Sequence, residues 1–129
     1  MNRLIEQAHG LGYVVEFASD LGHSGLLMPG RILINSSKRW MTQQAALAHE
    51  LGHIHYGHDW RYPHDRQRDE AQADAYAADL LIDPAAYAAA ESMYESLHAI
   101  ALELEVPLRF IQLWHERHRA TLSHLNARI

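Results

Sequence analysis

The sequence predicts an α+β fold in which a small antiparallel N-terminal sheet is followed by a mainly helical C-terminal half. Three observations lead to this prediction. Short β-branched and aromatic runs cluster before residue 36. Pro29-Gly30, a strong turn dipeptide, separates two of these runs. From about residue 42 onwards, apolar residues recur at three- and four-residue steps, as they do along one face of a helix.

The N-terminal elements follow from local composition. Residues 2–9 are expected to form a short helix that two glycines close. Residues 13–17 are β-branched and aromatic, which favours a strand. Residues 26–28 and 31–35 flank the Pro-Gly turn, so we expect them to pair as a hairpin.

The second half is predicted to be helical. Asp83 can cap one of its helices, because Pro84 then occupies the first helical position. This helix either extends or breaks near residues 91–92, and Val106-Pro107 forms a corner before the last helix. The expected helices cover residues 42–56, 66–82, 84–105 and 108–120.

Length and composition indicate one domain. A chain of 129 residues with 48% hydrophobic content has enough apolar side chains for one core, so we expect residues 1–129 to form a single domain. The helices at about 92–120 would then be an integral subregion for packing or docking.

Charge and hydropathy indicate which classes of binding partner to expect. The formal net charge of −5 argues against direct nucleic-acid binding, which needs a basic surface. The first 17 residues lack a long apolar stretch, and Glu6 interrupts the region where a signal peptide would be apolar. No later segment is long enough to span a bilayer, so we expect a cytoplasmic protein without a membrane partner.

The chain has no cysteine and eleven histidines. The lack of thiols excludes disulfide frameworks, thiolate metal sites and cysteine nucleophiles. A metal ion would therefore have to be held by His, Asp or Glu side chains.

The segment 49–53 reads His-Glu-Leu-Gly-His. His49 and His53 project from one face of the expected helix about one turn apart, a spacing that lets two neutral imidazoles bind one Zn²⁺. Glu50 lies about a quarter-turn aside, where it can act as a general base toward a water that the metal activates. The alternative is a surface helix with solvated histidines. A neighbouring apolar stripe favours a position near the core: Leu47, Leu51 and Ile54.

Gly52 lies inside this motif, although glycine costs a helix interior about 1 kcal/mol relative to Ala. Its presence indicates a close approach or an open cavity at this point; an ordinary packing contact is the simpler alternative.

A catalytic zinc site takes three protein ligands and leaves one position for water. Glu70 and Asp74 lie four residues apart on the next expected helix and are candidates for the third ligand. One can bind the metal while the other accepts the second N–H of a ligand histidine. One alternative is that both carboxylates are solvated. Another is that His58, His64 or Asp65 competes with Glu70 as third ligand.

The motif at 49–53 and the string Glu-Ala-Gln-Ala-Asp-Ala-Tyr-Ala-Ala-Asp-Leu-Leu at 70–81 resemble the ImmA/IrrE family of metallopeptidases, whose zincin core is similar to that of thermolysin. The resemblance covers about residues 30–120 and is specific at these two motifs. It implies a sheet packed on a zincin-type active-site helix.

The resemblance also assigns roles. It implies one zinc ion held by His49, His53 and Glu70, with Glu50 as the catalytic residue and Asp74 as the partner of His49. Mn²⁺ is an alternative, since a site of two histidines and a carboxylate accepts several divalent ions. The activity implied is hydrolysis of a peptide bond in a protein substrate, a DNA-binding helix-turn-helix repressor.

Residues just after the motif are candidate oxyanion donors. Zincins commonly use a Tyr or His donor to stabilise the tetrahedral intermediate, which makes Tyr56 and His58 candidates. His55 is expected to point away from the ligand face. For each of these residues, a solvated position at the helix end is the alternative.

Two hypotheses concern surfaces. The strand at 31–35 precedes the active-site helix, and its edge is expected to pair with an extended substrate peptide, unless it is an ordinary core strand. The segment 96–118 has a helix, a corner and a helix, as in a DNA-binding helix-turn-helix. Its glutamates offset its arginines, which favours a packing pair or a docking surface for a substrate protein.

Two functions of other classes compete with the peptidase. One is a noncatalytic zincin-like binding or sensor module that regulates a transcription factor; Glu50 counts against it, because a pure binder needs no base. The other is a small helix-turn-helix regulator, which the acidic balance disfavours. The oligomeric state is not indicated by the sequence.

Overall fold

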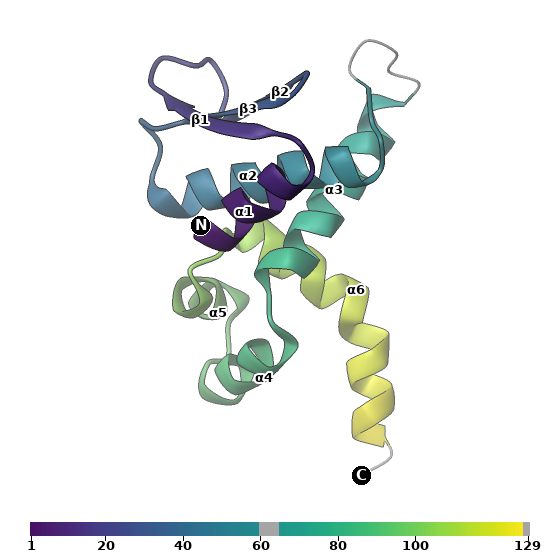
Figure 1. The fold of residues 1–129 in the computed structure, drawn as a ribbon. Helices are drawn as coiled ribbons and strands as arrows, with labels where there is room; N and C mark the ends of the chain where they lie inside the picture. Colours follow the sequence, from purple (N-terminus) through teal and green to yellow (C-terminus); the bar gives the residue numbers. More distant parts are fainter. Residues whose placement is uncertain (60–64, 128–129) are drawn as a thin grey trace. The chain divides into compact units, whose positions relative to one another are not determined.

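The structure is a computed structural model that describes residues 1–59 and 65–127, with side chains described up to residue 119. In chain order the elements are α1 (Asn2–Gly10), β1 (Val14–Ala18), β2 (Gly25–Met28), β3 (Arg31–Asn35), α2 (Trp40–His55), α3 (Arg66–Leu81), α4 (Pro84–Met93), α5 (Leu97–Leu104) and α6 (Leu108–Ala127) (Figure 1). The predicted α+β class is confirmed. The chain divides into two compact units, residues 1–77 and 78–129, and α3 runs from the first into the second.

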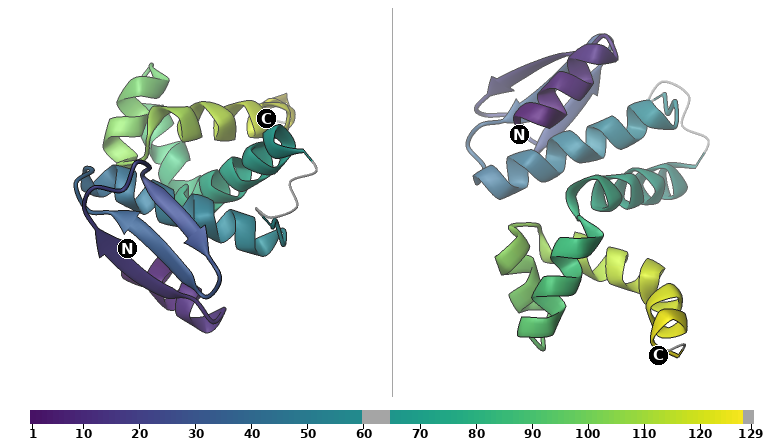
Figure 2. Two further views of the ribbon diagram at one scale, coloured as in Figure 1. Left: turned by 90° about the horizontal axis from the view of Figure 1, so that it is seen from above. Right: turned by 60° about the horizontal axis from the view of Figure 1, so that its bottom comes forward.

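The sheet of the first unit is mixed, so the prediction of an antiparallel sheet is wrong for one of its two pairings. The strand order is β1-β3-β2 (Figure 2). β2 and β3 form the expected antiparallel hairpin, but β1 pairs with β3 in parallel, with Val15 opposite Ile32 and Phe17 opposite Ile34. The physical reason is burial: β3 carries Ile32 and Ile34, both fully buried, and the central position covers this strand on both edges.

The central place of β3 also overturns the hypothesis that its edge receives a substrate peptide. Both edges of β3 are already paired within the sheet. Within the described residues, β2 is hydrogen-bonded in the sheet to β3 alone, so β2 is the edge strand on this side.

The sheet and α1 hold α2 in place. α2 packs against β2, β3 and α1, and α1 also contacts β1 (Figure 1). The buried residues of α2 are mainly small and apolar, and its fully buried leucines are Leu47 and Leu51. The helix that carries the His-Glu-x-x-His motif is therefore packed against both the sheet and α1.

Gly52 lies where α2 meets α3. A Cβ atom on this residue would lie 2.7 Å from the carbonyl oxygen and 2.8 Å from the Cα of Ala73 on α3. Contacts this short against backbone cannot be relieved by a side-chain rotation. The glycine therefore permits the close approach of α2 and α3.

We expect Gly52→Ala to lower the free energy of unfolding of the metal-free protein by about 1–3 kcal/mol, because overpacking outweighs the better helix propensity of alanine. Urea unfolding measures this effect. The matched control is Gly10→Ala, at a helical glycine where a Cβ would meet nothing within 4 Å. Equal stabilities for Gly52→Ala and wild type would contradict the close approach.

The second unit contains α4, α5 and α6, with α4 packed on α5 and α5 on α6. Asp83 caps α4 as predicted, because its carboxylate accepts the Ala86 N–H at 3.0 Å and Pro84 opens the helix. The expected helix at 84–105 is broken into α4 and α5. The predicted corner before α6 begins at Glu105, which adopts a left-handed conformation with φ of 56°.

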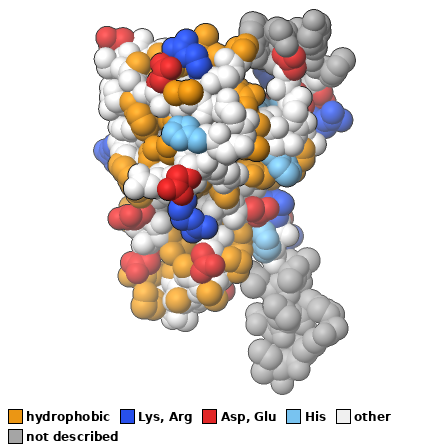
Figure 3. All heavy atoms as spheres, viewed as in Figure 1, with side chains coloured by type: hydrophobic (Ala, Val, Ile, Leu, Met, Phe, Trp, Pro, Cys, Tyr) orange, Lys and Arg blue, Asp and Glu red, His pale blue; other side chains and the backbone are white. Residues whose placement is uncertain are grey.

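Two observations concern the molecule's surroundings. Among the described residues, none of the helices combines the length and apolar character that a membrane crossing requires. On the face that Figure 3 shows, Lys and Arg side chains are scattered among Asp and Glu side chains rather than gathered into a basic patch.

Candidate metal centre

Helices α2 and α3 bring three side chains of the first unit together. The Nε2 atoms of His49 and His53 lie 3.0 Å apart. The Glu70 carboxylate lies against both, with Oε2 at 2.8 Å from His49 Nε2 and Oε1 at 3.2 Å from His53 Nε2. Each histidine side chain is about 15% exposed, whereas that of Glu70 is 52% exposed. The cluster is thus built into the helix pair but open to solvent on the Glu70 side.

The outer ring nitrogens of both histidines are also held. Asp74 Oδ1 lies 2.8 Å from His49 Nδ1, the contact that the resemblance implied. His53 Nδ1 lies 2.9 Å from His58 Nδ1. Both imidazoles are therefore fixed in orientation by a second contact.

The contact with Asp74 defines the tautomer of His49. The Asp74 carboxylate can only accept, so His49 Nδ1 carries a proton and donates it. For a neutral His49 ring, Nε2 then presents a lone pair toward His53 Nε2 and toward the Glu70 carboxylate. This lone pair and the Glu70 carboxylate repel each other at 2.8 Å unless a proton or a metal cation lies between them. Two imidazoles and one carboxylate are a common donor set for catalytic zinc, so these residues fit a divalent ion.

In the metal-free chain a proton can serve as the cation. The pKa of His49 is raised: burial has the largest single influence and lowers it, but the Asp74 hydrogen bond and the charges of Glu50, Asp74 and Glu70 outweigh burial. The pKa of His53 is lowered, first by burial and then by the charge of His49. Metal binding therefore competes with protonation of His49 more than with protonation of His53.

Glu50 is a buried carboxyl group beside this cluster, with an exposed fraction of 8%. Its pKa is raised from 4.5 to about 7: burial raises it most, the charge of His49 lowers it, and the charge of Glu70 raises it. A carboxyl group with a pKa near neutrality can exchange a proton at physiological pH, as a general acid or base must.

This shift predicts a pH dependence of stability for the metal-free protein. Between pH 4.5 and 7, folded Glu50 keeps a proton that the unfolded chain has lost, so the free energy of unfolding falls as pH rises. The effect is about 3 kcal/mol, at about 1.4 kcal/mol per pH unit. We expect Glu50→Gln to remove this part of the pH dependence in urea unfolding at pH 5 and pH 8 with chelator present. Parallel pH profiles for the variant and wild type would contradict the raised pKa.

A comparison of the sequence with known protein families agrees with this geometry. A family model described as the IrrE N-terminal-like domain, of a peptidase family, matches residues 6–113 of the 129. The chain belongs to this family. The comparison with curated proteins finds no match. Family membership supports a metallopeptidase domain, and the cluster of two histidines and a glutamate in this IrrE N-terminal-like domain is able to bind a metal.

The remaining predicted site residues of this IrrE N-terminal-like domain lie around the cluster. Tyr56 is half-exposed at the end of α2, with its ring nearly parallel to that of His58. His55 stacks on Tyr76 of α3, with ring centroids 4.6 Å apart. Asp65 accepts the backbone N–H of Arg68 at the start of α3. His64, weighed as an alternative ligand, lies outside the described residues.

Both ring nitrogens of His58 contact other side chains, so neither of them is among the atoms that would bind the metal ion. Its Nδ1 meets the outer nitrogen of His53, and its Nε2 lies 2.9 Å from Gln72 Oε1 and 3.3 Å from Asp69 Oδ1. Sequence reasoning missed Gln72 and Asp69. The available signal was the three-residue step from Asp69 to Gln72, which places these two side chains on one face of α3.

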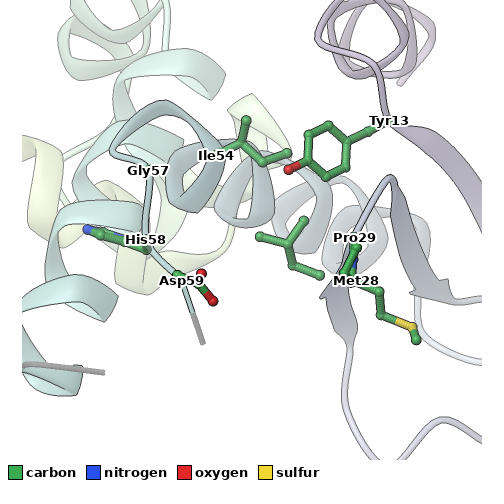
Figure 4. A pocket seen from close by; sticks show the side chains of 8 residues that line it. Tyr13, Met28, Pro29, Ile54, Gly57, His58 and Asp59 are labelled. Carbon is green, nitrogen blue, oxygen red and sulfur yellow. The ribbon is translucent and has the colours of Figure 1, made fainter. Parts of the chain in front are cut away.

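A pocket of about 310 Å³ opens beside the end of α2, within the first unit. Figure 4 shows Tyr13 and the Pro29 turn on one side of it and His58 at the opposite margin, with the His58 ring turned away from the other lining residues. Its apolar lining includes Leu27, Met28 and Ile54.

Proposed function

We propose that this IrrE N-terminal-like domain is a zinc-dependent endopeptidase. The observation that carries the proposal is the convergence of His49 Nε2, His53 Nε2 and the Glu70 carboxylate within about 3 Å of one another. His49, His53 and Glu70 would hold the metal. Zn²⁺ is the ion we propose, with Mn²⁺ as the alternative that the same donors accept.

When bound, the zinc ion polarises the scissile carbonyl and lowers the pKa of water. The chain's own residues supply the rest. Glu50 takes a proton from the attacking water and delivers it to the leaving amine. Its pKa of about 7 in the metal-free chain suits a group that must both accept and donate a proton. Asp74 keeps the His49 ring in the tautomer that presents Nε2.

The edge strand β2 is the element that we propose to align the substrate. β2 packs against α2, and the pocket beside the end of α2 is lined by Leu27 and Met28 of this strand. An extended peptide that pairs with the outer edge of β2 would gain backbone hydrogen bonds and could place an apolar side chain in the pocket. We therefore propose for β2 the pairing with substrate that the sequence analysis expected of residues 31–35.

The substrate that we propose is a helix-turn-helix repressor, which would place the activity in the cytoplasm. This step rests on the resemblance to the ImmA/IrrE peptidases. The noncatalytic alternative has less support, because a binding module would not need a buried carboxyl group with a raised pKa beside the cluster.

The test is a comparison of newly formed protein N-termini in cells that produce the wild type or Glu50→Gln. The proposal expects new termini in a repressor with the wild type only, and cleavage of the purified repressor by the zinc-loaded enzyme. The same termini with both proteins, or no new termini with either, would overturn it.

A further inference from the structure

His58 reaches the metal cluster through the way in which α2 ends. Tyr56 is the last residue in a right-handed conformation, and Gly57 follows with φ of +68°. Gly57 N–H then donates to the Ile54 carbonyl at 3.1 Å, and His58 N–H donates to the His53 carbonyl at 2.9 Å. This is the pair of hydrogen bonds of a Schellman motif, which needs a left-handed residue such as glycine. The motif returns the chain onto His53.

The His58 side chain adds a second link to the same residue. Its Nδ1 lies 2.9 Å from His53 Nδ1, and its ring is stabilised on the other side by Gln72 and Asp69 of α3. The ring is also nearly parallel to that of Tyr56, at 13° with centroids 5.6 Å apart. The side chain of His58 is 12% exposed, so water competes little for these contacts. His58 is held from three directions.

The contacts of His58 with α3 decide which ring nitrogens donate and which accept. Asp69 is a carboxylate and can only accept, so neutral His58 carries its proton on Nε2 and donates it toward Asp69 and the Gln72 carbonyl oxygen. His58 Nδ1 is then an acceptor, and His53 Nδ1–H must be the donor. The Nε2 lone pair of His53 is thereby left free on the side of His49 and Glu70.

We propose that His58 is a positioning residue that fixes the tautomer and ring orientation of the metal ligand His53, an inference that rests on the proposed zinc site. It does for His53 what Asp74 does for His49, but with a neutral acceptor in place of a carboxylate. Partners of this kind typically contribute 10–100-fold to metal affinity. The chain of contacts from α3 through His58 to His53 also links the third-ligand helix to the second ligand.

The experiment measures the zinc dissociation constant, by competition with a chromophoric chelator, in the wild type and four variants. His58→Phe removes the acceptor and keeps an aromatic ring. His58→Asn places an amide oxygen near the position of Nδ1, whereas His58→Gln places its amide near Nε2. The matched control is His55→Phe, which replaces a neighbouring histidine that stacks on Tyr76. Thermal unfolding of each metal-free protein separates loss of affinity from loss of structure.

The proposal expects His58→Phe to bind zinc at least about 10-fold more weakly than wild type, His58→Asn to recover most of this loss, and His58→Gln to recover little. His55→Phe should bind as wild type does, and the metal-free proteins should unfold at similar temperatures. Zinc affinity of His58→Phe within twofold of wild type would overturn the inference and leave the proposed function intact. Equal recovery by Asn and Gln would also overturn it, because the position of the acceptor atom would not matter. A wild type that binds no zinc would overturn both proposals.

Discussion

Glu50→Gln is expected to lower kcat/KM for the cleaved substrate by about 10²–10⁴-fold, the range over which a positioned general base contributes. The amide keeps the size of the carboxyl group but cannot take a proton from water. Zinc affinity should change little, because Glu50 is not among the three side chains whose ligand atoms converge. The loss should therefore appear in kcat, measured with zinc at saturation.

Two control measurements show whether the loss of activity has another cause. Zinc content of the variant must equal that of wild type, and its metal-free form should be as stable as wild type at pH 5 and more stable at pH 8, since the variant lacks a buried group that ionises near pH 7. Activity of Glu50→Gln within tenfold of wild type would contradict the assignment of the base.

Glu70→Ala is expected to weaken zinc binding by more than about 100-fold, beyond the range typical of residues that only support a ligand. The reason is geometric: among the described residues, Glu70 alone has a carboxylate that contacts both Nε2 atoms, so its loss leaves two imidazoles that face each other without a third donor. The pKa of His49 should also fall, since Glu70 is one of the charges that raise it. Chelator competition and an NMR titration of the histidines measure the two effects.

Gln67→Ala is the matched control, at an exposed position on the same helix. It should leave zinc affinity unchanged. If Glu70→Ala retained wild-type affinity, the third ligand would have to be another residue, and the cluster would not be the metal site that we propose.

The predictable parts of this molecule are those that short stretches of sequence determine. The apolar spacing of α2 and the cap at Asp83-Pro84 depend on neighbours within a few residues, so their positions followed from the sequence. The same holds for the faces of His49 and His53, because the helical repeat fixes which side chains project together.

The parts that failed depend on contacts between distant segments. The parallel pairing of β1 with β3 reflects which strand gains most from burial on both edges, a comparison that no single strand contains. The close approach at Gly52 was expected, but its partner Ala73 was not, and neither was the engagement of His58 by Gln72; both contacts reach α3 across more than ten residues. The sequence placed His58 near the site but could not show which of its ring nitrogens meets which partner.

The central claim is that His49, His53 and Glu70 bind one catalytic zinc ion. The most direct measurement is zinc content by elemental analysis, combined with X-ray absorption at the zinc edge of the purified protein. We expect one zinc per chain in a shell of nitrogen and oxygen donors that includes two imidazoles at about 2.0–2.1 Å. A protein that takes up no zinc at neutral pH, or a zinc shell with fewer than two imidazoles, would contradict the claim.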